Sequence, residues 1–466
     1  MVQSGRYAQT AQKGESMKKA TGFIACFVLI FIFTILLGCQ PTPEKPIVVG
    51  QGTDDLEGKL FVDPIAPYSY EAPEEIDDSI LMNTCTFYIK SRIEISESQT
   101  HPVFRLQQTR FSPNDAEKIC SLLVPDISAM RNASVETKEE IQEQILLLEQ
   151  GIPQYHEDGS ITYIHNEQAD KVLPDYYDAL EKAPAETFEP VNGTIDYTSP
   201  LEKVFKRTDG SKARCYVYDH SISVYPDNFG NIQMQSLIVR EGGWEGEGPV
   251  HLSPTLAADA AQQLGNDLLA ELDITNMGLA SIEAARMLDG LQGYNTLCTG
   301  WMLTYTRDEG LGVPFDSASV SPYCMKFQDD EEYAASWPQE TISVFLDENG
   351  IQFFNWENPC NIVEEVNANV ELLSFEDIYK RATDLIKQGF AWIDEPGTIC
   401  EDFYITRVLL TNCAVQIKDD IQTSYWIPTW VFVYQHESTL DNSVVPGYIA
   451  VNAIDGSRVE LCGTAE

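Results

Sequence analysis

A fifteen-residue apolar run near the start of the chain, Phe23–Leu37, most constrains how this sequence can fold, because all but one of its residues are apolar. Lys18 and Lys19 precede the run, and Gly38 and Cys39 end it. A positively charged stretch, an apolar stretch and a small residue at the end are the parts of a secretory signal. We therefore expect this segment to direct export and to stay outside the folded core.

The residues that end the run, Leu36-Leu37-Gly38-Cys39, resemble the bacterial lipobox, although Leu37 is bulkier than the residue usual there. The resemblance implies that a signal peptidase recognises Leu36, Leu37 and Gly38, and that the thiol of Cys39 carries the lipid. Residues 1–38 are then a lipoprotein signal peptide. The chain is expected at the extracellular face of the cell membrane, held there by acyl chains on Cys39.

An uncleaved transmembrane helix is the alternative, since Ala20 to Gly38 is close to the roughly 20 residues needed to span a bilayer. We favour lipid anchoring because the Gly-Cys pair stands where the apolar run stops. Met17 precedes the lysine pair and looks like a natural start, so residues 1–16 are interpreted as an upstream extension.

Residues 39–76 combine several prolines with many acids, a composition that predicts a flexible tether. Removing residues 1–38 takes away four basic residues and one acid, which leaves 26 basic and 71 acidic residues and a net charge near −45. Such a field repels phosphate backbones, so no nucleic-acid partner is expected.

Three folded units are expected behind the tether. An N-terminal α+β unit covers residues 77–190. Two related units follow, at 191–360 and 361–466, and in each a helix precedes about four antiparallel strands. The sequence therefore predicts an α+β fold built from tandem units of a helix packed on a four-stranded sheet.

Local signals mark the ends of these elements. Ser112, Ser253 and Ser374 are expected to cap helices, and a helix is expected over 136–151. Asn349-Gly350 and Asp455-Gly456 each stand between alternating stretches, which is the strongest short-range signal for a β-hairpin.

The last hairpin carries a resemblance to known proteins. Its residues 448–457, Tyr-Ile-Ala-Val-Asn-Ala-Ile-Asp-Gly-Ser, resemble the closing strand of PepSY-type domains. Together with the Gly312-Val313-Pro314 turn, the order of elements is similar to YycH and YycI, the exported regulators of the cell-wall sensor kinase. With the lipobox, the pattern resembles a family of uncharacterised lipoproteins from Gram-positive anaerobes. The resemblance implies binding or regulation and provides no catalytic residues.

The search for chemistry gives no catalytic set. Gly-x-Ser-x-Gly, His-Glu-x-x-His and Cys-x-x-Cys are all missing from the sequence. The acidic clusters His156-Glu157-Asp158, 329–332 and 347–350 are interpreted as solvated turns, with weak calcium binding as the alternative. We expect neither a metal nor another cofactor, and nine cysteines remain beyond Cys26 and Cys39 that could be buried or bridged.

Three tryptophans are the candidates for contact with a partner. Trp244 lies in an acidic glycine-rich loop, whereas Trp426 and Trp430 lie in an aromatic stretch that also reads as a core strand. The leading hypothesis is a membrane-anchored lipoprotein, not an enzyme, that binds or regulates another envelope protein or peptide. The alternatives are an envelope hydrolase acting on cell-wall glycan or peptide through paired carboxylates, and a solute-binding lipoprotein.

Overall fold

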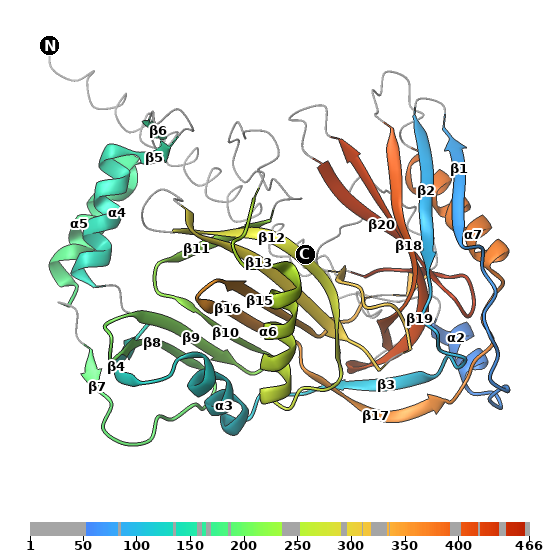
Figure 1. Cartoon of the computed structure of the whole chain (residues 1–466), viewed down its shortest axis with the longest axis horizontal. Coiled ribbons are helices and arrows are strands. Elements are labelled where there is room, and N and C mark those ends of the chain that lie inside the picture. Colours follow the sequence, from blue (N-terminus) through green and yellow to red (C-terminus); the bar gives the residue numbers. More distant parts are fainter. Residues whose placement is uncertain are drawn as a thin grey trace, which may run out of the picture. The chain divides into compact units, whose positions relative to one another are not determined.

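The computed structural model describes residues 53–82, 85–133, 137–155, 161–164, 169–184, 188–234, 252–289, 296–309, 311–317, 333–334, 336–391, 402–417, 420–437 and 444–461 (Figure 1). The predicted signal peptide, Cys39, Trp244, and the clusters at 156–158 and 329–332 lie outside these residues. Among the helices that are described, none is long and apolar enough to cross a membrane.

Nine of the described strands form the first large sheet, here called sheet A. Its main path runs β1-β2-β18-β19-β20-β21-β14, and β3 pairs with both β19 and β17. The strands are β1 (Glu75–Leu81), β2 (Thr86–Glu94), β3 (Val103–Gln108), β14 (Tyr333–Ala334), β17 (Cys360–Asn367), β18 (Phe403–Ile417), β19 (Asp420–Glu437), β20 (Val444–Asn452) and β21 (Arg458–Val459).

In the part of the chain that is described, ten strands form the second large sheet, sheet B, in the order β11-β12-β13-β15-β16-β10-β9-β8-β4-β7. The strands are β4 (Ile127–Asn132), β7 (Glu189–Pro190), β8 (Leu201–Arg207), β9 (Lys212–Tyr218), β10 (Ser221–Pro226), β11 (Phe229–Met234), β12 (Met277–Asp289), β13 (Thr296–Arg307), β15 (Thr341–Asp347) and β16 (Gly350–Glu357).

Each sheet packs against helices on its apolar side. Helix α7 (Phe375–Gly389) shares the core of sheet A with α2 (Thr53–Leu60), and the buried face of α7 follows the 3.6-residue period. Helices α3 (Pro113–Leu123) and α6 (Ala258–Glu271) share the core of sheet B. Helices α4 (Lys138–Gln150) and α5 (Ala169–Lys182) contact each other, beside the small hairpin of β5 (Ile152–Tyr155) and β6 (Ile161–Ile164).

The predicted fold class is wrong. The chain does not form tandem units with four-stranded sheets, because strands from the N-terminal region extend both sheets. Strand β2 pairs in parallel with β18, and β10, β9, β8, β4 and β7 continue sheet B beyond β16. A strand at a sheet edge carries unpaired backbone groups, and here other parts of the same chain pair with them. Of the strands within residues 77–190, β2 and β3 lie in sheet A, whereas β4 and β7 lie in sheet B.

Local sequence signals were mostly reliable. Ser112 forms a capping box with Asp115, and the Ser374 hydroxyl accepts from the Asp377 backbone N–H, as expected for helix N-caps. Helix α4 matches the expected 136–151 closely, with a capping box at its start. The prediction that Ser253 caps a helix is wrong, because α6 begins at Ala258 without a side-chain cap.

Both predicted hairpin turns are present. Asp347 pairs with Gly350 across the β15–β16 turn, where Gly350 has φ of 107°. Gly456 has φ of 79° in the turn before β21, so both turns use glycine in the left-handed region.

The expectation of a flexible tether is wrong for residues 53–76. The side chains of Leu56 and Leu60 on α2 are fully buried in the core of sheet A. The proline-containing stretch after them keeps an extended path because buried side-chain amides donate hydrogen bonds to its backbone carbonyls, as a neighbouring strand would. Asn367 Nδ2 donates to the carbonyls of Leu60 and Val62 at 2.9 and 3.0 Å, and Asn369 Nδ2 donates to those of residues 65 and 66.

Two tyrosines fix the next part of this stretch over His101, which is 2% exposed. The rings of Tyr68 and Tyr70 lie edge-on to the imidazole, at 5.4 and 6.2 Å between centroids. The Tyr70 hydroxyl donates to the Leu373 carbonyl at 2.8 Å. Burial lowers the pKa of His101 to about 4, so the ring is neutral at physiological pH.

Two antiparallel strands, β3 and β17, connect the sheets. Strand β3 leads from sheet A to α3, and β17 leads from sheet B back to α7. At the sheet B end of β17, the buried Arg307 side chain donates from Nε and Nη2 to Glu340 Oε2 at 3.0 and 2.6 Å. Arg307 also donates to the carbonyl of Cys360, and Trp356 Nε1 donates to Glu340 Oε1 at 3.1 Å.

Replacing Leu60 with alanine tests whether α2 is part of the fold. We expect the full chain to lose about 3 kcal/mol of unfolding free energy, because the substitution leaves a cavity in a packed core. Phe61→Ala is the matched control: this side chain is 58% exposed and its loss should change stability by less than about 0.5 kcal/mol. Urea unfolding measures both. Equal effects of the two substitutions would contradict the packing of α2.

Candidate functional site

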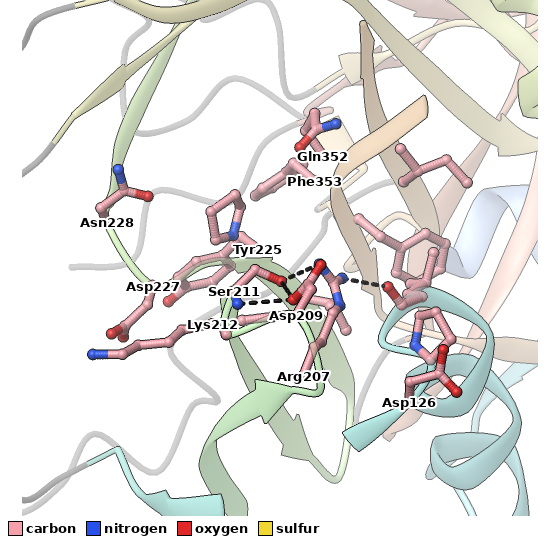
Figure 2. Close-up of a pocket in the computed structure, with 18 of the residues that line it drawn as sticks. Asp126, Arg207, Asp209, Ser211, Lys212, Tyr225, Asp227, Asn228, Gln352 and Phe353 are labelled. Atoms are coloured by element: carbon pink, nitrogen blue, oxygen red, sulfur yellow. Dashed lines mark hydrogen bonds between the residues drawn. The ribbon is translucent and has the colours of Figure 1, made fainter. Parts of the chain in front are cut away.

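A cavity of about 1000 Å³ lies where the connections of several sheet B strands meet (Figure 2). The turn from β8 to β9, the end of β10 and the turn from β15 to β16 each contribute, together with the connection from α3 to β4. Its polar lining includes Asp126, Arg131, Glu140, Arg207, Asp209, Ser211, Lys212, Asp227, Asn228, Asn349 and Gln352, and its apolar lining includes Leu122, Leu123, Tyr225, Phe353 and Phe354.

The buried Arg131 and the half-buried Arg214 form an ion network with two carboxylates at this wall. Arg131 on β4 donates to Glu140 on α4 at 2.5 Å, and its side chain is 6% exposed. Arg214 on β9 donates to Glu140 at 3.3 Å and to Asp227 at 2.8 Å. Arg131 also lies 3.8 Å from Asp227. The network ties β4, α4, β9 and the end of β10 together.

The carboxylate of Glu140 is fixed by hydrogen bonds at the N-terminus of its own helix, α4. Burial acts to raise the pKa of Glu140, but the backbone N–H of Thr137 and the Arg131 guanidinium outweigh it and hold the pKa below its usual value. Glu140 Oε2 accepts from the Thr137 N–H at 2.7 Å, as the second half of the capping box. Glu140 therefore stays ionised beside the arginines at neutral pH.

The β8–β9 turn is fixed by its own side chains. Asp209 accepts from the backbone N–H and the hydroxyl of Ser211 at 2.8 and 2.7 Å. These bonds hold the pKa of Asp209 below its usual range. Arg207 donates to the Leu123 carbonyl at 2.9 Å and to the Ser211 hydroxyl at 3.4 Å, which places its guanidinium against the α3 end (Figure 2).

A row of aromatic rings continues from the cavity along the same face of sheet B. Tyr225 stacks on Tyr216 at 5.8 Å and on Phe353 at 6.3 Å, and Phe229 lies 4.9 Å from Tyr225. Tyr216 in turn stacks on Tyr218, which is 40% exposed. Burial raises the pKa of Tyr225, so its hydroxyl stays protonated and can donate a hydrogen bond. Flat rings in fixed positions provide contact area at a small cost in side-chain entropy.

A second cavity of about 230 Å³ shares Arg131 and Thr137 with the first. Phe188 lies nearby, with Lys206, Lys212 and Arg131 at 5.3, 5.5 and 5.7 Å from its ring centroid. Basic residues are thus concentrated on this side of a strongly acidic chain.

The structure places two of the sequence-predicted partner residues in the interior. Trp430 is fully buried and packs against Phe375 at 5.0 Å. Trp426 is 4% exposed and shares a small core with Leu106, Trp337 and Cys360. Trp244, the predicted lipidation residue Cys39 and the predicted peptidase recognition residues Leu36, Leu37 and Gly38 lie outside the described residues.

The remaining candidates give no clustered site in the part of the chain that is described. Asp347 accepts from the Asn349 N–H at 2.7 Å and from Gln352 Nε2 at 3.0 Å, so its carboxylate shapes the hairpin turn. Within the described ranges, no group of three or more metal-binding side chains occurs. Among the cysteines described, those at positions 120, 215, 298 and 360 are free thiols.

Comparisons with known proteins give a distant likeness. No protein-family profile matches the chain, and no curated protein matches it. The chain is similar to an uncharacterised protein from Eubacterium rectale ATCC 33656 whose crystal structure is known at 1.45 Å resolution. The two share 14% sequence identity with a TM-score of 0.44, over 88% of this chain and 99% of that chain. This likeness carries no inference about function.

Replacing Glu140 with glutamine tests the ion network at the cavity wall. The substitution leaves Arg131 buried without its closest carboxylate, so we expect a loss of about 3 kcal/mol of unfolding free energy at pH 7. Because the pKa of Glu140 is lower in the folded chain, its contribution is present above the ordinary glutamate pKa of about 4.3 and is lost as the pH falls further. The stability difference should therefore shrink on acidification.

Glu117→Gln is the matched control, since this carboxylate is exposed on α3. It should change stability by less than about 0.5 kcal/mol. Urea unfolding at pH 7 and pH 4 measures both variants, and a Glu140→Gln effect no larger than the control's would contradict a structural role for the network.

Proposed function

We propose that this chain is a lipid-anchored binding protein of the bacterial envelope that holds a peptide segment of another exported protein in the cavity beside the β8–β9 turn. The observation that carries this proposal is the composition of the cavity lining. Aromatic faces of Tyr225 and Phe353 stand beside the amides of Asn228 and Gln352, and fixed charges of both signs surround them. A peptide offers the matching apolar, amide and charged groups.

The size of the cavity supports an extended ligand. Sites for small molecules commonly occupy about 300–1,000 Å³. This cavity lies at the upper end of that range. Its lining comes mainly from turns and strand ends of one sheet, with residues of α3 and α4 beside them, so a chain segment can run across several of these turns.

The rigidity of the wall also supports binding. The rings of Tyr216, Tyr225 and Phe353 are stacked, and the arginines are held by Glu140 and Asp227. Side chains that are already ordered lose little conformational entropy when a ligand arrives, and more of the contact energy is kept as affinity.

A display library of random peptides, selected on the purified full chain in a nonionic detergent, tests this function. We expect selected peptides to bind at least about tenfold more weakly to a Tyr225→Ala/Phe353→Ala variant, because aromatic anchors dominate the energy of such contacts. The matched control is Tyr88→Ala/Tyr404→Ala. This stacked pair lies on sheet A, with rings 5.6 Å apart and side chains 43% and 50% exposed.

Thermal unfolding establishes that both double variants keep their fold. Selected peptides that bind the Tyr225→Ala/Phe353→Ala variant as tightly as the unchanged chain would refute the cavity as the peptide site.

The anchoring part of the proposal rests on Cys39 and the lipobox-like residues before it. In a Gram-positive host fed an alkyne-labelled palmitate, the unchanged chain should take up the label. Cys39→Ala should abolish the label, because the acceptor thiol is gone. Cys26→Ala, in the apolar run, is the control and should keep it. Label retained in Cys39→Ala would rule out lipidation at this residue.

A further inference from the structure

One segment of the described chain lies against the core of sheet A without joining a sheet. Residues 61–73, here called the strap, run between α2 and β1 and form neither helix nor strand. None of the strap side chains is fully buried. The strap is therefore held mainly by hydrogen bonds. Segments with few buried apolar contacts are the ones that open locally while the rest of a protein stays folded.

Backbone hydrogen bonds attach the strap at two places. The N–H of Ile65 donates to the carbonyl of Asn369 at 3.1 Å, and the N–H of Tyr68 donates to the carbonyl of Gln99 at 2.9 Å. The Tyr68 hydroxyl accepts from the Leu372 N–H at 3.0 Å. The N–H groups of Ile65 and Tyr68 are thus protected from solvent exchange while the strap is in place.

The two tyrosines of the strap cover His101, whose ring is held in an unfavourable place for a charge. Its Nε2 is buried and has no hydrogen-bond partner within the described residues. A protonated imidazole carries hydrogens on both ring nitrogens. Protonation of His101 under the strap would therefore bury a positive charge with at least one unsatisfied N–H, which is costly.

The groups around His101 do not compensate such a charge. Among the described residues, no carboxylate forms an ion pair with the ring, and burial lowers its pKa to about 4. Burial, with smaller contributions from Glu371 and Asp377, raises the pKa of the Tyr68 and Tyr70 phenols, so both stay neutral at physiological pH. The carboxylates of the strap itself are exposed, at Asp63 and Glu71.

We propose that protonation of His101 releases the strap, which makes the strap an acid-sensitive cover over the core of sheet A. The ring must stay neutral under the docked strap, whereas release exposes it to water, where the charged form is stable. Release would uncover the side-chain amides of Asn367 and Asn369, which donate to the strap carbonyls. This inference goes beyond the proposed binding function and does not depend on it.

Docking of the strap weakens as the pH falls. The pKa of His101 is lowered from its ordinary value of 6.5 to about 4. Docking is therefore fully stabilised above the ordinary pKa and loses stability as the pH falls towards 4. Proton linkage with these two values weakens docking about twentyfold between pH 7 and pH 5. Ordinary carboxyl groups titrate near pH 4, so histidine accounts for most of the change in this range.

Amide hydrogen exchange on the full chain in a nonionic detergent tests the release. Rates are measured at pH 7 and pH 5 and corrected for the intrinsic effect of pH. We expect the protection of the Ile65 and Tyr68 N–H groups to fall about twentyfold at pH 5, because their hydrogen bonds exist only in the docked strap. Amides in the middle of β19 should keep their protection, since release leaves sheet A paired.

His101→Phe should remove the fall in protection, because a phenylalanine ring stays neutral under the strap at any pH. The matched control is His220→Phe, the same substitution at a histidine whose Nδ1 lies 2.7 Å from the Thr109 carbonyl. This control should keep the fall. Thermal unfolding at pH 7 checks each fold, and His101→Gln, which is also neutral, serves if the phenylalanine variant is unstable.

A fall of the same size in the His101 variant would overturn the proposal, since another group would then release the strap. Protection that stays constant from pH 7 to pH 5 in the unchanged chain would also overturn it. An equal fall in β19 would mean that sheet A loosens as a whole, and it would refute a release confined to the strap.

Discussion

The buried ion pair between Arg307 and Glu340 is the contact on which the connection of the two sheets depends. Arg307 ends β13, Glu340 precedes β15, and the carbonyl of Cys360 at the start of β17 accepts from the same guanidinium. Strand β17 begins its path to sheet A at this point. Loss of either charged partner would leave the other buried alone, which costs far more than the pair contributes in place. The position where the chain leaves sheet B is therefore held by specific hydrogen bonds as well as by apolar packing.

The fold could be predicted from the sequence where short-range chemistry determines it. The caps at Ser112 and Ser374 and the turn at Asn349-Gly350 depend on neighbouring residues, and each was found. The sheets could not be predicted, because alternation identifies a strand without identifying its partner. The pairing of β2 with β18 joins distant parts of the chain, and the Thr86 N–H donates to Asp402 across 316 residues. Composition also gave a wrong prediction of a flexible tether for residues 53–76. Several backbone carbonyls of this stretch accept hydrogen bonds from the side-chain amides of Asn367 and Asn369.

The candidate site could not be predicted from the sequence for a related reason. Aromatic content makes Trp426 and Trp430 candidates for contact with a partner. Large aromatic residues are often buried, however, and both tryptophans pack in the core of sheet A or at its margin. The cavity is assembled from Arg131, Tyr225 and Phe353, which are unremarkable in sequence and far apart along the chain. The density of basic residues in 203–214 is the sequence signal that could have indicated the cavity. It is noticeable only because the rest of the chain is acidic.

The order in which the chain visits the two sheets has a consequence for how the protein is made. Strands β1 to β3 come first, and β17 to β21 come last. The described strands of sheet B lie between them, within residues 127–357, and only the short β14 of sheet A falls in the same range. All of these sheet B strands are therefore synthesised before β18 exists. Pairings that close long loops form slowly, since the chain entropy must be lost first. During synthesis, sheet B can form before β17 to β19 are available to pair with β2 and β3, so two of the first strands made reach their final pairing last.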